Sequence, residues 1–198
     1  MSLLGWSIDG EKEILSREEI QAAFNLDRLS KSNANFDEDK FLFLNGWYIR
    51  NLPRETIVER VRPFLDRAGL AAPGRDDAWY AYVIGLEVER CRLLSEFVEA
   101  LQYFFVAPTT YEAAGVKKLM KEGVDAQLEG VRAKLAEVAD WTVESTEGVV
   151  KAYAEAAGLG LGKVAQPIRL AVSGRTATPG LFEVLIALGR EETLARID

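Results

Sequence analysis

Residues 162–189 read GKVAQPIRLAVSGRTATPGLFEVLIALG, and this stretch carries the clearest fold signals in the chain. Pro167 lies where a helix is expected to start, and Gly174 is a typical helix end. Thr178 followed by Pro179 is a typical N-cap and first helical residue. The stretch therefore predicts two short helices joined by a polar, glycine-containing elbow.

The charge of this stretch sets it apart from the rest of the chain. No Asp or Glu occurs between Glu155 and Glu183, although the whole chain has a formal net charge of -7. The gap contains Lys163, Arg169 and Arg175. Cations beside a predicted helix N-terminus suit phosphates or the acceptor edges of bases. The alternative is a solvated elbow between two packed helices.

The remaining sequence also predicts helices. Ser16 and Glu19 have the spacing of a capping box, and Pro53 is suited to the first residue of a helix that Gly69 ends. A helical pattern starts again at Asp76, after a candidate hinge at residues 73–75, and breaks near Gly85 and residues 93–95. Sustained apolar–polar alternation is almost absent. The chain is therefore predicted to be all-α.

An aromatic stripe is expected on the helix that follows Asp37. Phe41, Trp47 and Tyr48 fall at helical spacing after a polar loop at residues 30–35. Because the stripe lies on one face of the helix, we expect it to pack in the core and not to stack on bases.

Composition limits the possible functions. A chain of 198 residues with 48% hydrophobic content can form one domain or two small helical lobes. An acidic chain is not a generic nucleic-acid binder, so RNA binding would depend on local patches. The absence of histidine removes the usual general base and the commonest metal ligand. No apolar run approaches the roughly 20 residues of a membrane span. We therefore expect a cytoplasmic protein with no catalytic residue and no metal site.

The single cysteine, Cys91, excludes a disulfide framework and a thiolate zinc site. Its neighbours Arg90 and Arg92 favour a lowered thiol pKa. Because no base accompanies it, a catalytic thiol is not predicted.

Several segments resemble bacterial glutamyl-tRNA synthetases, class I enzymes whose C-terminal end reads the anticodon. They cover nearly the whole chain in the family's order: LLGW at 3–6, LNGWYI at 44–49, VERCRLLSEF at 88–97, KVAQPIRLAVSG at 163–174 and TPGLFEVLIALG at 178–189. The resemblance implies the all-α anticodon-binding helical cage of that family, with two packed subdomains at residues 1–107 and 108–198. Residues 1–10 would be a remnant of the linker from the catalytic body.

The resemblance also assigns a role to Arg90. In the family, the arginine of this turn recognises the third anticodon base in discriminating enzymes, which charge only the glutamate tRNA. The rigid fork of arginine can hold a base edge through two hydrogen bonds. The alternative is a surface arginine paired with Glu87 or Glu89.

Five positions match those that touch the first two anticodon bases in the family: Arg169, Thr178, Pro179, Gly180 and Leu181. The resemblance implies that Arg169 donates to a base or phosphate, that Thr178 and the backbone at Gly180 contact base edges, and that Leu181 packs on a base face. The alternative for Leu181 is core packing beside Phe182.

Lys163 and Arg175 are weaker candidates of the same site, as contacts to phosphates. The segment at residues 175–177 departs from any fixed family pattern, which leaves its contacts open.

The resemblance implies that the chain is the anticodon-binding C-terminal portion of a glutamate–tRNA ligase. Its partner would be the anticodon loop of the glutamate tRNA, with no DNA or membrane partner, and it would be a monomer. Full-length relatives use ATP and Mg²⁺, whereas this chain lacks the HIGH and KMSKS signatures and is expected to be inactive alone, without a cofactor. The alternatives are a freestanding helical module that binds RNA or protein, and a helical scaffold without an RNA role.

Overall fold

The computed structural model describes residue 6, residues 13–29 and residues 36–198. Over these ranges the chain forms eleven α-helices and one short 3-10 helix and contains no strand, which confirms the predicted all-α class. The predicted linker remnant at residues 1–10, apart from Trp6, and the predicted polar loop at residues 30–35 lie outside the described residues.

Six helical elements form the first half of the chain. They are α1 (Arg17–Ala23), η2 (Leu26–Arg28), α2 (Glu38–Asn51), α3 (Arg54–Arg67), α4 (Asp77–Glu87) and α5 (Glu96–Phe105). The capping box is confirmed, because the Glu19 amide donates to Ser16 Oγ over 3.1 Å and the Ser16 amide donates to Glu19 Oε2 over 2.8 Å. Gly85 does not interrupt α4, and the helical pattern breaks at residues 88–95.

Six helices form the second half. They are α6 (Ala113–Leu119), α7 (Val124–Ala136), α8 (Val143–Ala156), α9 (Leu161–Ser173), α10 (Leu181–Leu188) and α11 (Arg190–Ile197). Gly174 has the left-handed φ of 74° that a helix-ending glycine supplies without strain, so the predicted end of α9 is confirmed.

Two predicted details of the elbow are wrong. Helix α9 starts at Leu161, which places Pro167 inside the helix and not at its start. Helix α10 starts at Leu181 with Gly180 as its N-cap, so Thr178 and Pro179 precede the helix. The Thr178 hydroxyl accepts a hydrogen bond from Arg169 and donates to the Pro179 carbonyl over 3.0 Å instead of capping the helix. A tertiary contact has replaced the local one.

The aromatic stripe of α2 is only partly in the core. The residues of this helix that are buried are Gly46 and Ile49, whereas Trp47 and Tyr48 are half-buried. Phe41 is 40% exposed, so the prediction that it packs in the core is wrong. Helical spacing alone does not reveal which face of a helix another element covers.

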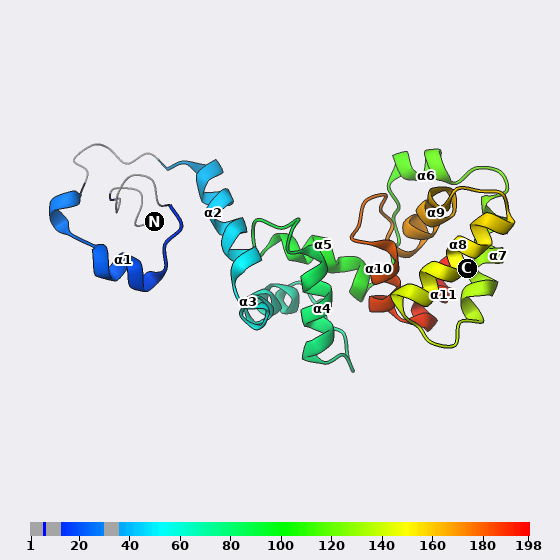
Figure 1. The fold of residues 1–198 in the computed structure, drawn as a ribbon, viewed down its shortest axis with the longest axis horizontal. Coiled ribbons are helices and arrows are strands. Elements are labelled where there is room, and N and C mark those ends of the chain that lie inside the picture. The colour runs from blue at the N-terminus through cyan, green and yellow to red at the C-terminus, as the bar shows by residue number, and fades with distance from the viewer. Residues whose placement is uncertain (1–5, 7–12, 30–35) are drawn as a thin grey trace.

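One hydrophobic core cluster extends from Ile49 in α2 to Ile197 in α11. Helices α3, α4 and α5 contact one another, and α7, α8, α9 and α11 form a second group. Helix α10 contacts α4 as well as α8, α9 and α11, and Figure 1 shows it between the two groups. The core therefore runs through α10.

The loop before α4 and the first turn of α4 are fastened to the end of α10. Arg75 Nη2 donates to the Leu188 carbonyl over 3.0 Å, and Trp79 Nε1 donates to the Ala187 carbonyl over 2.8 Å. On the opposite side, Trp141 Nε1 donates to the Leu185 carbonyl over 3.1 Å. The Ala187 and Leu188 carbonyls lie in the last turn of α10, where a helix leaves carbonyls without intrahelical partners, whereas the Leu185 carbonyl also accepts from the Gly189 amide over 3.0 Å. The loop predicted as a hinge is thus an attachment point.

A buried arginine joins the C-terminal helix to the rest of the core. The Arg196 side chain is 5% exposed and pairs with Glu192 over 2.7 Å. Its Nη1 donates to the Tyr103 carbonyl over 2.6 Å and to the Val172 carbonyl over 2.8 Å. One guanidinium therefore connects α11 with α5 and α9.

Within the described residues, none of the helices combines the length and apolar character needed to cross a bilayer.

Candidate nucleic-acid interface

The elbow between α9 and α10, residues 174–180, is held in place by hydrogen bonds to other segments of the chain. The Gly174 amide donates to the Leu170 carbonyl over 2.8 Å, and the Gly174 carbonyl accepts from the Glu112 amide over 2.9 Å. The Glu112 carboxylate accepts from the backbone amide and the hydroxyl of Thr176, and these bonds lower the pKa of Glu112. The connector before α6, residues 108–112, therefore fixes the first half of the elbow.

Arg169 fixes the second half. Its Nη1 donates to the Thr178 hydroxyl and, over 2.6 Å, to the Pro179 carbonyl. Thr178 is buried and 6% exposed. Burial lowers the pKa of the Arg169 guanidinium from its ordinary value, although arginine stays charged. Three of the predicted site residues, Arg169, Thr178 and Pro179, are therefore in direct contact.

Arg90 reaches the same elbow from the first half of the chain. Its Nη2 donates to the Thr178 carbonyl over 2.7 Å, and its side chain is 47% exposed. Its Nε lies 3.9 Å from Glu87 Oε2, so the surface pairing considered from the sequence is also present. Glu89, the other partner considered, lies 3.9 Å from Arg50 instead.

The turn that carries Arg90 is held by one carboxylate. Glu96 Oε2 accepts from the Arg92 amide over 2.6 Å and from the Leu93 amide over 3.1 Å. The side chain of Asn45 in α2 also donates to the Arg92 carbonyl. The position of Arg90 relative to α5 is therefore well defined.

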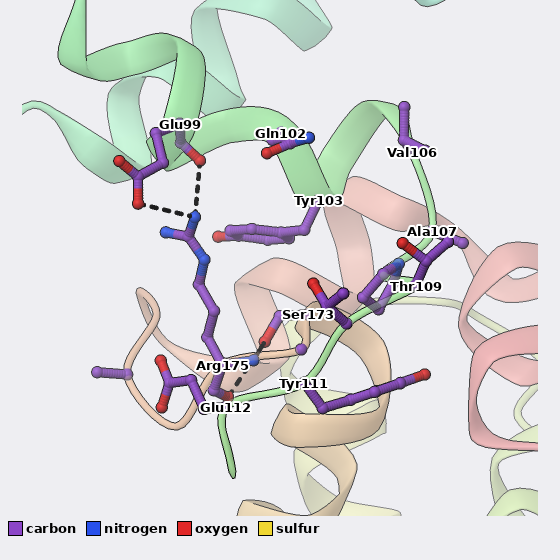
Figure 2. A pocket seen from close by; sticks show the side chains of 14 residues that line it. Glu99, Gln102, Tyr103, Val106, Ala107, Thr109, Tyr111, Glu112, Ser173 and Arg175 are labelled. Carbon is purple, nitrogen blue, oxygen red and sulfur yellow. Dashed lines mark hydrogen bonds and ion pairs between the residues drawn. The ribbon is translucent and has the colours of Figure 1, made fainter. Parts of the chain in front are cut away.

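Arg175 lines a groove of about 490 Å³ beside the elbow. Figure 2 shows its side chain extending towards Glu99, past the ring of Tyr103. Arg175 Nη2 donates to the Glu99 carbonyl over 3.0 Å and lies 3.5 Å from Glu99 Oε1. Glu99 and Glu112 also line this groove, so a phosphate that binds Arg175 would have to take the place of Glu99 as its partner. The predicted phosphate contact of Arg175 stays a prediction.

The structure places Lys163 apart from the elbow. It is exposed in the first turn of α9, and its carbonyl accepts from Gln127 Nε2 over 3.0 Å. With a rise of 1.5 Å per residue, it lies roughly 9 Å along the helix from Arg169. It is suited to a phosphate outside the elbow, not to the same contact as Arg169.

The N-terminus of α10 is not the open phosphate site that the sequence predicts. Gly180 is exposed, but the Glu183 carboxylate occupies the space where a Gly180 side chain would begin. The positive end of the helix is therefore already compensated by its own carboxylate. Leu181 is 4% exposed and belongs to the core cluster, which favours the core-packing alternative for this residue.

Sequence reasoning missed the burial of two polar residues near Arg90. Glu87 and Tyr103 are each 4% exposed, and Tyr103 Oη donates to Glu87 Oε1 over 3.3 Å. Burial raises the pKa of Glu87, while Arg90, Tyr103 and Arg175 lower it by a smaller amount. Burial and the charge of Glu87 also raise the pKa of Tyr103. The one sequence signal was the three-residue spacing of Glu87 and Arg90.

Cys91 is expected to be inert in the folded chain. Burial, Glu87 and Glu96 raise its thiol pKa to about 12, against the lowering by Arg90, so the direction favoured by the sequence is wrong. At pH 8 the folded chain should react with iodoacetamide on the order of 1000-fold more slowly than the chain in urea. Mass spectrometry of timed samples measures both rates. Equal rates would show that the thiol is accessible and ionised in the folded state.

Comparison with known proteins agrees with this geometry. A family model described as an anticodon binding domain matches residues 56–198. The chain is 38% identical over 202 residues to the glutamate–tRNA ligase of Moorella thermoacetica, and this match covers 100% of the chain and 41% of that protein. It is 38% identical over 199 residues to the ligase of Thermodesulfovibrio yellowstonii, with coverage of 100% and 43%.

A solved structure is also similar. The crystal structure of a glutamate tRNA ligase from Elizabethkingia meningosepticum matches with a TM-score of 0.88 and 28% identity, over 99% of this chain and 38% of that chain. The chain spans about two fifths of the length of these relatives. The comparisons support anticodon recognition over a freestanding module without a synthetase role. The chain therefore belongs to the anticodon-binding domain family and is homologous to the C-terminal part of glutamate–tRNA ligases.

Proposed function

We propose that this chain reads the anticodon loop of the glutamate tRNA, and that it does so as a monomer in the cytoplasm. The elbow residues Arg169, Thr178, Pro179 and Gly180 would face the first two anticodon bases, and Arg90 would face the third. Leu181 would support the elbow from the core side, and Lys163 and Arg175 would contact the RNA backbone.

The contact between Arg90 and the Thr178 carbonyl carries this proposal. The two residues are 88 positions apart in the sequence, yet they are joined by a hydrogen bond of 2.7 Å. Two segments that resemble the family's base-reading segments thus form one surface. Proteins recognise a single-stranded RNA loop by hydrogen bonds from side chains to its unstacked bases. One continuous surface can therefore contact adjacent bases of the loop.

The parent activity is also part of the proposal. The relatives are glutamate–tRNA ligases, and a longer protein containing this chain would join glutamate to its tRNA with ATP and Mg²⁺. The described residues include no group of three or more His, Cys, Asp or Glu side chains that could hold a metal ion. Division into subdomains at residues 1–107 and 108–198 is likewise proposed.

Replacing Arg90 with glutamine should reduce discrimination at the third anticodon base. Loss of a bidentate base contact corresponds to roughly 1–3 kcal/mol, or about 5- to 150-fold in the affinity ratio. Titration of fluorescent anticodon stem-loops that differ only in the third base measures this ratio at constant salt. Arg92→Gln is the matched control, because it removes the same charge two residues away.

The control should weaken binding to all loops by a similar factor and leave the ratio unchanged, because charge alone acts without regard to sequence. If Arg90→Gln discriminates the third base as well as the wild type does, the role given to Arg90 is wrong. If the wild-type chain binds no stem-loop at low salt, anticodon reading by the chain alone is wrong.

A further inference from the structure

We propose that Glu87 is a positioning residue that orients the Arg90 guanidinium for the third anticodon base. This inference rests on the proposed function of Arg90. Nothing in the sequence resemblance or in the comparisons assigns a role to Glu87. The experiments below distinguish a failure of this inference about Glu87 from a failure of the proposed role of Arg90.

The two oxygens of the Glu87 carboxylate have different partners. Glu87 is the last residue of α4 and is 4% exposed. Oε1 accepts the Tyr103 hydroxyl proton over 3.3 Å, and Oε2 lies 3.9 Å from Arg90 Nε. Tyr103 is itself fixed in α5, and its carbonyl accepts from Arg196. The carboxylate is therefore held on one side by the core and faces Arg90 on the other.

Two contacts together fix the plane of the Arg90 guanidinium, whereas either contact alone would leave it free to rotate. The hydrogen bond from Nη2 to the Thr178 carbonyl leaves the group free to rotate about that bond. Attraction of Nε to Glu87 restrains this rotation, because the guanidinium is planar and its donors have a fixed geometry. Neither contact uses Nη1, which has two N–H donors for a base edge.

Stability does not account for a carboxylate in this position. Burial is the largest influence on Glu87 and disfavours its charged form. Replacing a buried ion pair by apolar residues of similar volume is often neutral or stabilising, so the pair is weak evidence for a stabilising role. At neutral pH, Glu87→Gln removes the burial cost and keeps an acceptor for Tyr103. The variant is therefore expected to fold.

The test compares Glu87→Gln with Glu89→Gln. Both remove one negative charge near Arg90, but the Glu89 side chain is 78% exposed and lies next to Arg50. With the stem-loops described above, Glu87→Gln should reduce third-base discrimination by about 2- to 10-fold. Glu89→Gln should raise affinity slightly for every loop and leave discrimination unchanged. The double variant Glu87→Gln/Arg90→Gln should discriminate no worse than Arg90→Gln alone.

Additive losses in the double variant, or unchanged discrimination in Glu87→Gln beside a loss in Arg90→Gln, would overturn the inference. Unchanged discrimination in Arg90→Gln would instead overturn the proposed function of Arg90. A structural role alone would lower thermal stability without changing the base ratio, and a thermal melt of each variant measures this separately.

A second measurement needs no RNA. In a ¹⁵N-labelled chain, the Arg90 Nε–H signal is assigned by its absence in Arg90→Gln. It should exchange with solvent faster in Glu87→Gln than in the wild type, and at the wild-type rate in Glu89→Gln. Equal exchange in Glu87→Gln and wild type would overturn the inference even if no stem-loop binds. If Glu87→Gln does not fold, Glu87→Asp is tested in its place. Aspartate keeps the carboxylate, but its shorter side chain moves that charge away from Arg90.

Discussion

Replacing Arg196 with methionine is expected to lower the free energy of unfolding by about 3–5 kcal/mol, or the melting temperature by roughly 10 °C. The guanidinium is 5% exposed and donates to the carbonyls of Tyr103 and Val172. Methionine fills much of the same volume but has no donor, so two carbonyls lose their partner inside the core. An unsatisfied buried acceptor is more costly than the hydrogen bond was worth.

Arg132→Met is the matched control. Arg132 also donates to a backbone carbonyl, that of Leu194, over 2.9 Å, and it lies 3.5 Å from Asp198. Its side chain is 37% exposed, so water can replace the lost donor. The control should lose about 1 kcal/mol or less in urea unfolding followed by circular dichroism. Similar losses for the two variants would show that Arg196 does not hold α5, α9 and α11 together.

The second large effect is expected from Gly174→Ala, which should lose about 2–4 kcal/mol of stability. A Cβ atom at this position would lie 2.7 Å from the Thr110 carbonyl oxygen and 3.0 Å from the Pro108 Cβ. The φ of 74° adds the usual strain of a left-handed residue. The connector at residues 108–112 would therefore have to move away from the elbow.

Gly158→Ala separates the two causes. Gly158 has a similar φ of 66°, but nothing lies within 4 Å of a Cβ placed there. Only the strain of about 1–2 kcal/mol is expected in this control. The difference between the variants in urea unfolding measures the clash with the connector. If the losses are equal, the close approach of the connector contributes nothing to stability.

Local signals in the sequence predicted the local structure well. The capping box of Ser16 and Glu19, the αL glycine at Gly174 and the absence of strand alternation depend on neighbours within a few residues. The N-cap of α8 is of the same local kind, because the Thr142 side chain accepts from the Ser145 amide. Interactions of this range are present in the chain before any tertiary contact forms.

The candidate site required information that local signals do not contain. Thr178 and Pro179 have the composition of a helix start, but in the folded chain Arg169 binds both, and α10 starts at Leu181. From the sequence Glu87 is a possible partner of a surface arginine, but the folded chain buries it against Tyr103 of α5. Contacts between distant segments decided each of these cases. The resemblance to the family pointed to Arg90 and Arg169 as candidates because a family pattern carries such contacts implicitly.

The attachment of Trp79 to the end of α10 has a consequence for folding during synthesis. The acceptor of its indole N–H, the Ala187 carbonyl, is translated 108 residues after Trp79. At about 5–20 residues per second, helices α3 to α5 wait roughly 5–20 s on the ribosome before this acceptor exists. Over that period their face towards α10 is open to water. Chaperone contact with the nascent chain should therefore concentrate on residues around Trp79.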